Sequence, residues 1–444
     1  MKRSAILFFI ILHSWVADAQ SLADKLDEYL SANARLGKFN GVAFVARRDT
    51  IILHKGYGWR NAEKRIAHDV KSVFQIGSVT KQFTSAAILR LQEQGKLSVK
   101  DTIGKYFPGF PNGGIITIEH LLTHTSGIYN YTNDNQFMST RADKPITMEK
   151  MLELFRDKPL DFAPGFKWSY SNSGYILLGY IISKVSGKSY EQYVRDLIFT
   201  PLRMENSGFD FKSLTHPAKS VGYFVLNGDT LRAPIVDSSV SYAAGAIYST
   251  ASDLYKWHKS LYTDKVIKQA SLEKAFTPFK SNYGYGWIIV NLDGKKLITH
   301  GGGIFGFTAD ILRVPSDDIC IILLVNKPEN INTITLGLYD IMNNKPVVMP
   351  KERPQVKLAE DVLKKYTGEY ELTPAFKIVV TLENGKLKGQ ATGQSKFELF
   401  PEREDFFFLK VVDAQLEFIK GSDGSIQSLI LHQGGMKQKG VKIK

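Results

Sequence analysis

The chain has 444 residues, of which 43% are hydrophobic and 23% are charged, and its formal net charge is +13. A chain of this size can build substantial cores, and at ~150 residues per domain it predicts two or three domains. The basic residues are spread along the chain apart from the tail KQKGVKIK, and no nucleic-acid-binding motif occurs. This charge therefore favours anionic envelope surfaces over nucleic acid. Cys320 is the only cysteine, so an internal disulfide is excluded and a buried, inert thiol is expected.

The first 19 residues have the features of a secretory signal peptide. Lys2 and Arg3 form a basic start, residues 5–12 form an apolar run, and ADA ending at Ala19 provides a small-residue cleavage site. That run is too short to span a bilayer, and no later stretch reaches the ~20 apolar residues that a transmembrane helix needs. We therefore expect a periplasmic or secreted protein without a transmembrane segment.

Residues 20–345 predict one α/β (α+β) unit, because strand-like runs lie at both ends and helical patterns lie between them. An amphipathic helix at 21–36 precedes a hairpin with strands at 41–47 and 50–58. A helix that begins near Ser78 leads into a helical, loop-rich middle section. Four strand-like runs and a helix-like run follow, at 284–290, 295–302, 308–314, 319–325 and 332–344. The sheet of this unit must pair N-terminal with C-terminal strands, and helices must flank it.

A proline-rich stretch separates this unit from a second one. Residues 346–357 contain three prolines and are predicted to be a linker. Residues 358–444 alternate strand-like runs with Asn-Gly and Asp-Gly turns, which predicts a small all-β barrel or sandwich. This second unit holds no acid–base cluster, so we expect an accessory domain there.

Ser78 and Lys81 form a Ser-x-x-Lys motif at the start of a predicted helix. Three residues make one helical turn, so the hydroxyl and the amine lie on the same face and can approach each other. An unprotonated lysine can take the proton of the serine, and desolvation can lower its pKa enough for this. Two other interpretations stay open, since serine is a favoured helix cap and a second copy occurs at Ser271 and Lys274.

Tyr170 and Asn172 form a Tyr-x-Asn motif just before an apolar helix. A tyrosine phenolate beside an ammonium group can act as a general base, and an asparagine amide can hold a substrate carbonyl. Alternatively, the neighbouring serines cap the helix and Tyr170 only packs. This spacing also has a second copy, at Tyr131 and Asn133 in a polar loop.

The segment LITHGGGIFGF places His300 at the end of an apolar strand, followed by three glycines. Glycines allow a ligand to approach the backbone closely, and an exposed strand here can offer the N–H group of Gly303 to an oxyanion. The alternative is a turn or bulge without a ligand.

Two other kinds of site are disfavoured. His-Gly-Gly-Gly also occurs in lipases with the α/β-hydrolase fold, but the G-x-S-x-G elbow of that fold is missing from the chain. His120 and His124 have the spacing of a metal pair, yet no glutamate of the zinc-protease motif lies between them and no third ligand is apparent. We therefore expect structural histidines, and we predict neither a metal nor a cofactor.

Taken in order, S-V-T-K, Y-S-N and H-G-G resemble the three motifs of the serine β-lactamase and penicillin-binding-protein superfamily. The segments HLLTHTSGI and YGYGW resemble the class C-like branch, which includes esterases and D-amino-acid peptidases. The resemblance covers about residues 22–345 and implies a β-lactamase-like sheet flanked by helices with a helical subdomain. It implies these roles: Ser78 as acylated nucleophile, Lys81 as its proton partner, Tyr170 as general base, Asn172, His300 and Gly302 as substrate-binding residues, and the N–H groups of Ser78 and Gly303 as oxyanion hole.

One departure from the family pattern bears on the substrate. β-Lactamases typically carry Lys-Thr-Gly or Lys-Ser-Gly where this chain has His300-Gly301-Gly302. Imidazole is mostly neutral at pH 7, so it should anchor a substrate carboxylate more weakly than lysine. We therefore expect a serine hydrolase that acts on small ester, amide or peptide substrates, including D-amino-acid or cell-wall-derived peptides. The alternatives are a β-lactamase or penicillin-binding activity, and a non-enzymatic binding or sensing module on the same fold.

Overall fold

The computed structural model describes residues 21–226, 229–394, 396–410, 414–433 and 436–444. The predicted signal peptide, residues 1–19, lies outside these described residues. The chain divides into two compact units, one ending at Pro350 and one spanning Lys351–Lys444. No helix in the described part of the chain is long and apolar enough to cross a membrane.

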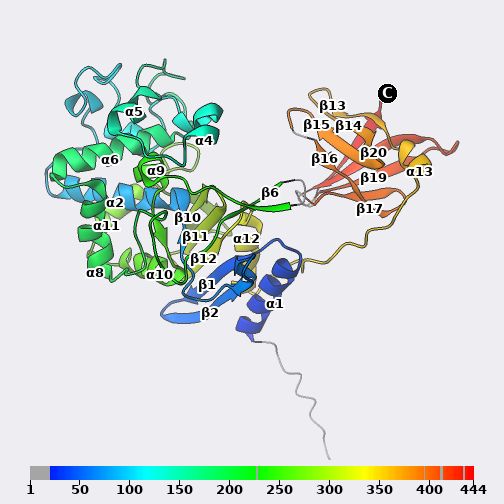
Figure 1. Ribbon diagram of the computed structural model, residues 1–444, viewed down its shortest axis with the longest axis horizontal. Helices are drawn as coiled ribbons and strands as arrows, with labels where there is room; N and C mark the ends of the chain where they lie inside the picture. The colour runs from blue at the N-terminus through cyan, green and yellow to red at the C-terminus, as the bar shows by residue number, and fades with distance from the viewer. Residues whose placement is uncertain (1–20, 227–228, 395, 411–413, 434–435) are drawn as a thin grey trace, which may run out of the picture. The chain divides into compact units, whose positions relative to one another are not determined.

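The first unit is built on a six-stranded antiparallel sheet in the order β2-β1-β12-β11-β10-β9 (Figure 1). N-terminal strands therefore pair with C-terminal ones, as predicted, and Gly41 of β1 lies opposite Val325 of β12. The strands are β1 (Gly41–Arg47), β2 (Thr50–Tyr57), β9 (Ile288–Leu292), β10 (Lys295–Ile304), β11 (Phe307–Val314) and β12 (Ile319–Val325).

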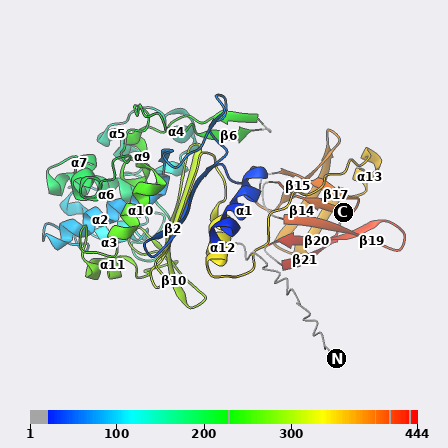
Figure 2. The same ribbon diagram turned by 90° about the horizontal axis from the view of Figure 1, so that it is seen from below.

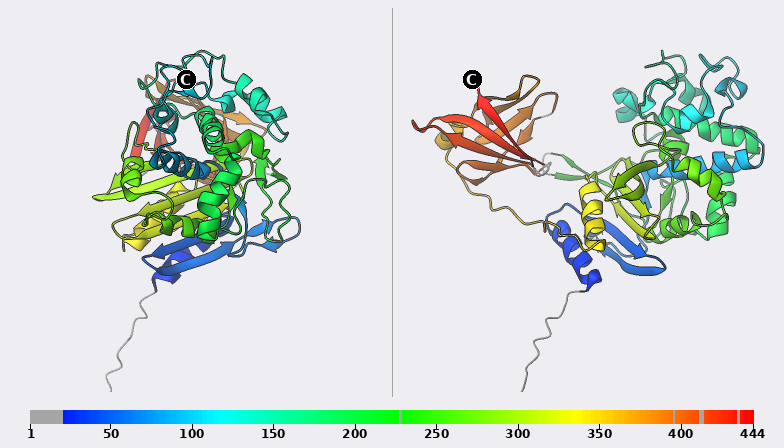
Figure 3. Two further views of the ribbon diagram at one scale, coloured as in Figure 1. Left: turned by 90° about the vertical axis from the view of Figure 1, so that its left-hand side faces the viewer. Right: turned by 180° about the vertical axis from the view of Figure 1, so that it is seen from behind.

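Helices cover both faces of this sheet (Figures 2 and 3). On one face, α1 (Leu22–Arg35) and α12 (Asn332–Met342) pack against each other and against the sheet. The helical subdomain covers the opposite face. Every residue of β12 is buried, and alternate side chains enter the two cores, because neither face is left to solvent. Cys320 of this strand is buried, as expected, and burial raises the pKa of its thiol.

The helical subdomain gathers segments between β2 and β9. It contains α2 (Thr80–Glu93), α3 (Ile118–Leu122), α4 (Asn135–Thr140), α5 (Met148–Glu153), α6 (Asn172–Ser186), α7 (Tyr190–Val194), α8 (Thr200–Leu202), α9 (Ser238–Gly245), α10 (Ala251–Ser260) and α11 (Gln269–Ala275). Short helical turns lie at η1 (Gly77–Val79), η2 (Ile103–Lys105), η3 (Tyr131–Asn133) and the π-helix η4 (Arg195–Phe199), and short strand pairs at β3 (Trp59–Asn61) with β4 (Ile66–Ala67), β5 (Phe74–Gln75) with β8 (Tyr248–Ser249) and β6 (Tyr223–Leu226) with β7 (Asp229–Arg232).

One predicted strand begins later than expected. The run 284–290 was predicted to be extended, but β9 begins at Ile288. Gly286 has a φ of +85°, and the N–H group of Gly284 donates to the carbonyl of Trp287 at 2.9 Å. The two glycines therefore form a turn where the apolar pattern alone suggested a strand.

The second unit is a nine-stranded antiparallel sheet in the order β16-β15-β14-β13-β21-β20-β19-β18-β17 around its own core of aliphatic and aromatic side chains. It comprises α13 (Glu360–Lys364), β13 (Gly368–Thr373), β14 (Phe376–Glu383), β15 (Lys386–Ala391), β16 (Phe397–Glu398), β17 (Phe400–Arg403), β18 (Phe406–Phe408), β19 (Ala414–Lys420), β20 (Ile426–Gln433) and β21 (Met436–Lys442). This all-β architecture confirms the predicted fold class of the C-terminal region.

Candidate active site

Ser78 lies in the single turn η1, directly before α2. The N-cap of α2 is Val79, and no side chain makes a capping hydrogen bond there. Ser78 therefore does not act as the helix cap that its sequence position also allowed. Its side chain is partly exposed and makes no capping hydrogen bond to α2.

Lys81 follows one turn later and is completely buried. Its Nζ lies 3.1 Å from Ser78 Oγ, 2.8 Å from Asn172 Oδ1 and 2.8 Å from the carbonyl oxygen of Ala244. Burial lowers the pKa of Lys81 well below its ordinary value of 10.5. The described residues around Nζ supply no carboxylate, so the low pKa is not offset by an ion pair.

Tyr170 lies on the other side of this lysine. The centre of its ring is 4.8 Å from Lys81 Nζ. Its buried hydroxyl has no hydrogen-bond partner of good geometry among the described residues. Ser78 lies near this hydroxyl and offsets a part of the pKa increase that burial causes. Burial dominates and raises the pKa of Tyr170 above its ordinary value of 10.0. The protonated phenol is therefore favoured over the phenolate.

His124, which was expected to be a structural histidine, packs against Tyr170, a position that the sequence did not predict. Its ring centre lies 4.2 Å from that of Tyr170 and 4.6 Å from that of Tyr283. Its Nδ1 accepts a hydrogen bond from the N–H group of Ser171 at 3.2 Å. Burial and Lys81 lower the pKa of His124 well below 6.5, so it is a neutral packing partner. Its neighbour His120 completes a capping box with Thr117, and no metal-binding cluster occurs in the described residues.

Asn172 is held from two sides at the start of α6. Its backbone N–H group donates to Asn130 Oδ1 at 3.0 Å, and its Nδ2 donates to Thr132 Oγ1 at 3.1 Å. The loop with the second Tyr-x-Asn copy thus orients the asparagine of the first copy. Tyr131 of that loop is buried and donates to the carbonyl of Val240 at 2.7 Å, which is a structural role.

His300 lies on β10 and is buried and neutral. Its Nδ1–H donates to the carbonyl of Gly301 at 2.6 Å, and its Nε2 accepts from the hydroxyl of Tyr283 at 2.8 Å. The carbonyl can only accept, and this assigns the proton to Nδ1. Burial and the nearby Lys81 lower the pKa of His300 to about 3. Tyr283 was not singled out in the sequence, although it is the first residue of the YGYGW segment.

Glycines let β10 pass directly against η1. A Cβ atom on Gly302 would collide with the carbonyl oxygen of Ile76 and would come within 3.1 Å of Ser78 N. A Cβ atom on Gly77 would lie 2.8 Å from the carbonyl oxygen of Gly303. The two segments that carry the predicted oxyanion-hole N–H groups, those of Ser78 and Gly303, are therefore in contact. Gly303 itself is exposed.

A backbone kink supplies the third partner of Lys81. Tyr242, inside α9, has φ 36° and ψ −131°, a conformation that a non-glycine residue adopts only under strain. The kink turns two carbonyl groups toward α2: that of Ala243 accepts from Thr84 Oγ1 at 2.7 Å, and that of Ala244 accepts from Lys81.

The structure brings together all the residues predicted for the site and leaves the second serine–lysine copy outside it. Ser78, Lys81, Tyr170, Asn172, His300, Gly302 and Gly303 converge where η1 and the start of α2 meet the start of α6 and strand β10. Ser271 of α11, in contrast, donates a hydrogen bond to Glu93 Oε1 of α2 at 2.6 Å.

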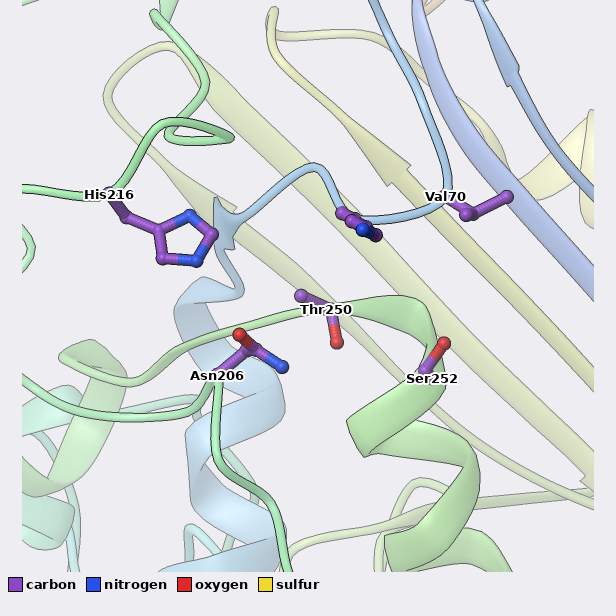
Figure 4. Close-up of a pocket in the computed structure, with 6 residues that line it drawn as sticks. Val70, Asn206, His216, Thr250 and Ser252 are labelled. Atoms are coloured by element: carbon purple, nitrogen blue, oxygen red, sulfur yellow. The ribbon is translucent and has the colours of Figure 1, made fainter.

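Two hollows lie elsewhere on the first unit. One of about 310 Å³ is lined by Val70, Lys71, Asn206, His216, Thr250 and Ser252, none of them a predicted site residue (Figure 4). Another of about 170 Å³ is lined by Phe305, two residues beyond Gly303, with Met138, Ser139, Thr140, Asp143, Lys144 and Pro234.

This fold and this cluster agree with the known proteins that the chain resembles. The family model described as Beta-lactamase matches residues 25–335, and a Domain of unknown function (DUF3471) matches residues 352–442. The chain therefore belongs to the β-lactamase family.

Two of the proteins that are similar over nearly the whole chain are named as a penicillin-binding protein and a penicillin-binding protein homologue. The chain is 31% identical over 436 residues to penicillin-binding protein 4* of Bacillus subtilis, covering 92% of this chain and 96% of the relative. It is 27% identical to the octameric penicillin-binding protein homologue from Pyrococcus abyssi, with a TM-score of 0.68 over 94% of this chain and 99% of that one. A D-stereospecific amidohydrolase from Streptomyces sp. matches with 25% identity and a TM-score of 0.59, over 68% of this chain and 93% of that one.

Proposed function

We propose that the chain is an exported serine hydrolase that cleaves ester or amide bonds through an acyl-enzyme on Ser78. The observation that carries this proposal is the environment of Lys81. A neutral amine has two N–H groups and one lone pair. The carbonyl groups of Asn172 and Ala244 take the two N–H groups, so the lone pair is directed to the hydroxyl of Ser78.

The reaction then follows in balanced steps. Ser78 Oγ attacks the carbonyl carbon while its proton passes to Lys81, and the N–H groups of Ser78 and Gly303 stabilise the oxyanion. As the intermediate collapses, the leaving group takes the phenol proton of Tyr170, which is restored from the Lys81 ammonium. Water next attacks the ester of the acyl-enzyme, and its proton returns Ser78 to the hydroxyl form. Lys81 is the base in this scheme, because burial favours a neutral amine and a protonated phenol.

The neutral state of His300 bears on the substrate. An imidazole with a pKa of about 3 carries no charge at neutral pH, so it cannot form an ion pair with a substrate carboxylate. This favours esterase or peptidase activity over efficient β-lactam hydrolysis. The similarity to a D-stereospecific amidohydrolase supports D-amino-acid amides or peptides among the substrates.

The test compares hydrolysis of a p-nitrophenyl ester and of a chromogenic cephalosporin by the wild type, Ser78→Ala and Ser271→Ala. Ser271 is a matched control, because it belongs to the second Ser-x-x-Lys copy. We expect Ser78→Ala to lose at least about a thousandfold in kcat while Ser271→Ala keeps its activity. We also expect the ester to be cleaved much faster than the cephalosporin.

Full activity in folded Ser78→Ala would refute the acyl-enzyme. If the wild type cleaves neither compound, a fluorophosphonate label decides between a narrow peptide specificity and the binding-module alternative. Labelling at Ser78 supports the first, and its absence supports the second.

A further inference from the structure

The basic tail KQKGVKIK, residues 437–444, forms most of strand β21 in the second unit. It is the only dense cluster of basic residues in the chain, and it takes no part in the proposed reaction. In the nine-stranded sheet, β21 lies between β13 and β20 (Figure 2). The fold therefore gives this cluster a fixed place on a sheet with neighbours on both sides.

The side chains along β21 and the residue after it alternate between the core and the solvent. Gly440 is buried, and Lys442 Nζ lies 5.8 Å from the centre of the Tyr370 ring, which belongs to the core. Because successive side chains of a strand point to opposite faces, the residues between these two lie on the outer face. The outward residues are Lys437, Lys439, Val441 and Ile443, and all four are exposed.

The neighbouring strands add branched apolar side chains to the same face. Ile430 of β20 lies opposite Lys439. Ile419 of β19 and Val441 lie on either side of Ser428 in one cross-strand row, and they are 36% and 55% exposed. Adjacent exposed apolar residues of this kind mark an interaction surface. We name the following residues the β21 face: Ile419, Ile430, Lys437, Lys439, Val441 and Ile443.

The two lysines of the β21 face carry uncompensated charge. Lys437 and Lys439 are exposed, and neither pairs with a carboxylate in the described part of the second unit. The carboxylates on the neighbouring strands β13 and β19 are already paired with other cations. These pairs are Glu369–Lys377, Glu371–Lys377 and Glu417–Arg403, at 3.0, 3.3 and 3.1 Å. The β21 face is therefore both apolar and positively charged.

A lipid bilayer with anionic headgroups matches both properties of the β21 face. Its phosphate groups attract lysines, and the apolar layer beneath the headgroups accepts branched side chains. A dissolved polyanion would contact only the lysines and would leave the apolar side chains in water. Residues 437–443 extend over roughly 20 Å of strand, at about 3.3 Å per residue, so the face can contact several headgroups at once.

We propose that the second unit docks on anionic lipid bilayers through the β21 face. The lysines contact the headgroup phosphates, and Ile419, Val441 and Ile443 enter the layer below them. This docking is independent of the hydrolysis proposed for Ser78, because the second unit holds no group of the candidate active site. It would keep an exported enzyme at the surface of the envelope.

The test measures co-sedimentation of the full-length protein with vesicles of phosphatidylglycerol and phosphatidylethanolamine, with phosphatidylcholine vesicles as the reference. We expect binding to the anionic vesicles that weakens in 0.5 M NaCl, because salt screens exposed charges. Lys437→Gln together with Lys439→Gln should weaken binding by about thirtyfold, since each lysine near an anionic surface contributes about fivefold.

A second pair of lysines provides the matched control. Lys364→Gln together with Lys365→Gln removes the same charge from two exposed residues at the end of α13, and it should weaken binding by less than about threefold. Val441→Ser together with Ile443→Ser tests the apolar contact and should weaken binding by at least about tenfold with both lysines in place. Thermal melting shows whether each variant is folded.

A fluorescent label reports whether the β21 face enters the bilayer. Cys320 is buried and is the only cysteine, so Val441→Cys can be labelled selectively with a nitrobenzoxadiazole dye. Its emission should increase and shift to the blue with anionic vesicles, whereas the same dye on Lys365→Cys should not respond.

Four results would overturn the proposal. The first is the absence of binding to anionic vesicles, and the second is an equal loss of binding in the two lysine pairs. The third is binding of soluble polyphosphate as tight as that of vesicles, with no effect of Val441→Ser and Ile443→Ser, which would indicate a polyanion site. The fourth is a dimer in analytical ultracentrifugation that these two serine substitutions dissociate, without vesicle binding, which would show that a second copy covers the face.

Discussion

Lys81 is buried, and no carboxylate among the residues that the structure describes pairs with it, which is a costly state for a lysine. An isolated ammonium in an apolar interior loses hydration worth several kcal/mol, so the neutral amine becomes the favoured form. The hydrogen bonds to Asn172 and Ala244 suit that form equally well. In the proposed mechanism, this burial is what allows Lys81 to act as the base.

The pH dependence of the reaction should report Lys81. Protonation of Lys81 removes the base, so kcat/KM for a neutral ester should fall as pH decreases through its lowered pKa. His300, with a pKa of about 3, stays neutral throughout pH 5–9 and should not contribute. A pH–rate profile checks this: His300→Gln should keep the inflection, and Lys81→Arg, which stays protonated, should lose several orders of magnitude at every pH. An inflection that disappears in His300→Gln would contradict the assignment.

At the scale of elements, the site depends on the close contact of β10 with η1 and on the kink in α9. The contact of β10 with η1 tolerates no additional methyl group at Gly302 or at Gly77. The strained Tyr242 costs on the order of 1–3 kcal/mol, and in return it directs two carbonyl groups to α2. The strain at Tyr242 thus lowers the stability of the fold at the place where α9 holds Lys81 beside Ser78.

Gly302→Ala should separate β10 from η1, because its Cβ would collide with the carbonyl of Ile76. A displacement of about 1 Å between the two oxyanion-hole segments is expected to lower kcat by roughly a hundredfold. Gly301→Ala is the matched control, since its Cβ would lie 3.8 Å from the nearest atom, the carbonyl oxygen of Ala309. Steady-state kinetics and thermal melting of both variants check this. Equal kinetics for the two would show that the close contact is unimportant.

At the scale of the whole molecule, each unit has a core of its own. Every residue of the candidate site belongs to the first unit, and the nine-stranded second unit encloses a separate apolar cluster. We therefore expect that the chemistry needs only the first unit.

A chain of residues 20–350 should fold and hydrolyse small esters through Ser78 with a kcat/KM within about threefold of the full-length value. The two cores and all the catalytic groups of the first unit remain in this fragment. Circular dichroism and ester hydrolysis of the fragment, with its Ser78→Ala variant as control, provide the measurement. Failure to fold or a large loss of turnover would assign the C-terminal unit a part in the active enzyme.

The sequence by itself determined the features that depend on residues close to each other in the chain. Ser78 and Lys81 meet because they are one helical turn apart, and alternating strand patterns with Asn-Gly turns predict the β-rich end of the chain. The ordered motifs also led to Tyr170 and His300, and all of these residues converge in the structure.

Only the tertiary structure decided how charged those groups are and what holds them. Lys81 and Ala244 are 163 residues apart, and their hydrogen bond depends on a kink that no local pattern signals. The sequence does not indicate that His124 and Tyr283 lie at the site, yet in the structure His124 packs against Tyr170 and Tyr283 donates a hydrogen bond to His300. The depth at which folding buries a side chain sets its pKa, and burial is a property of the complete packing of sheet and helices.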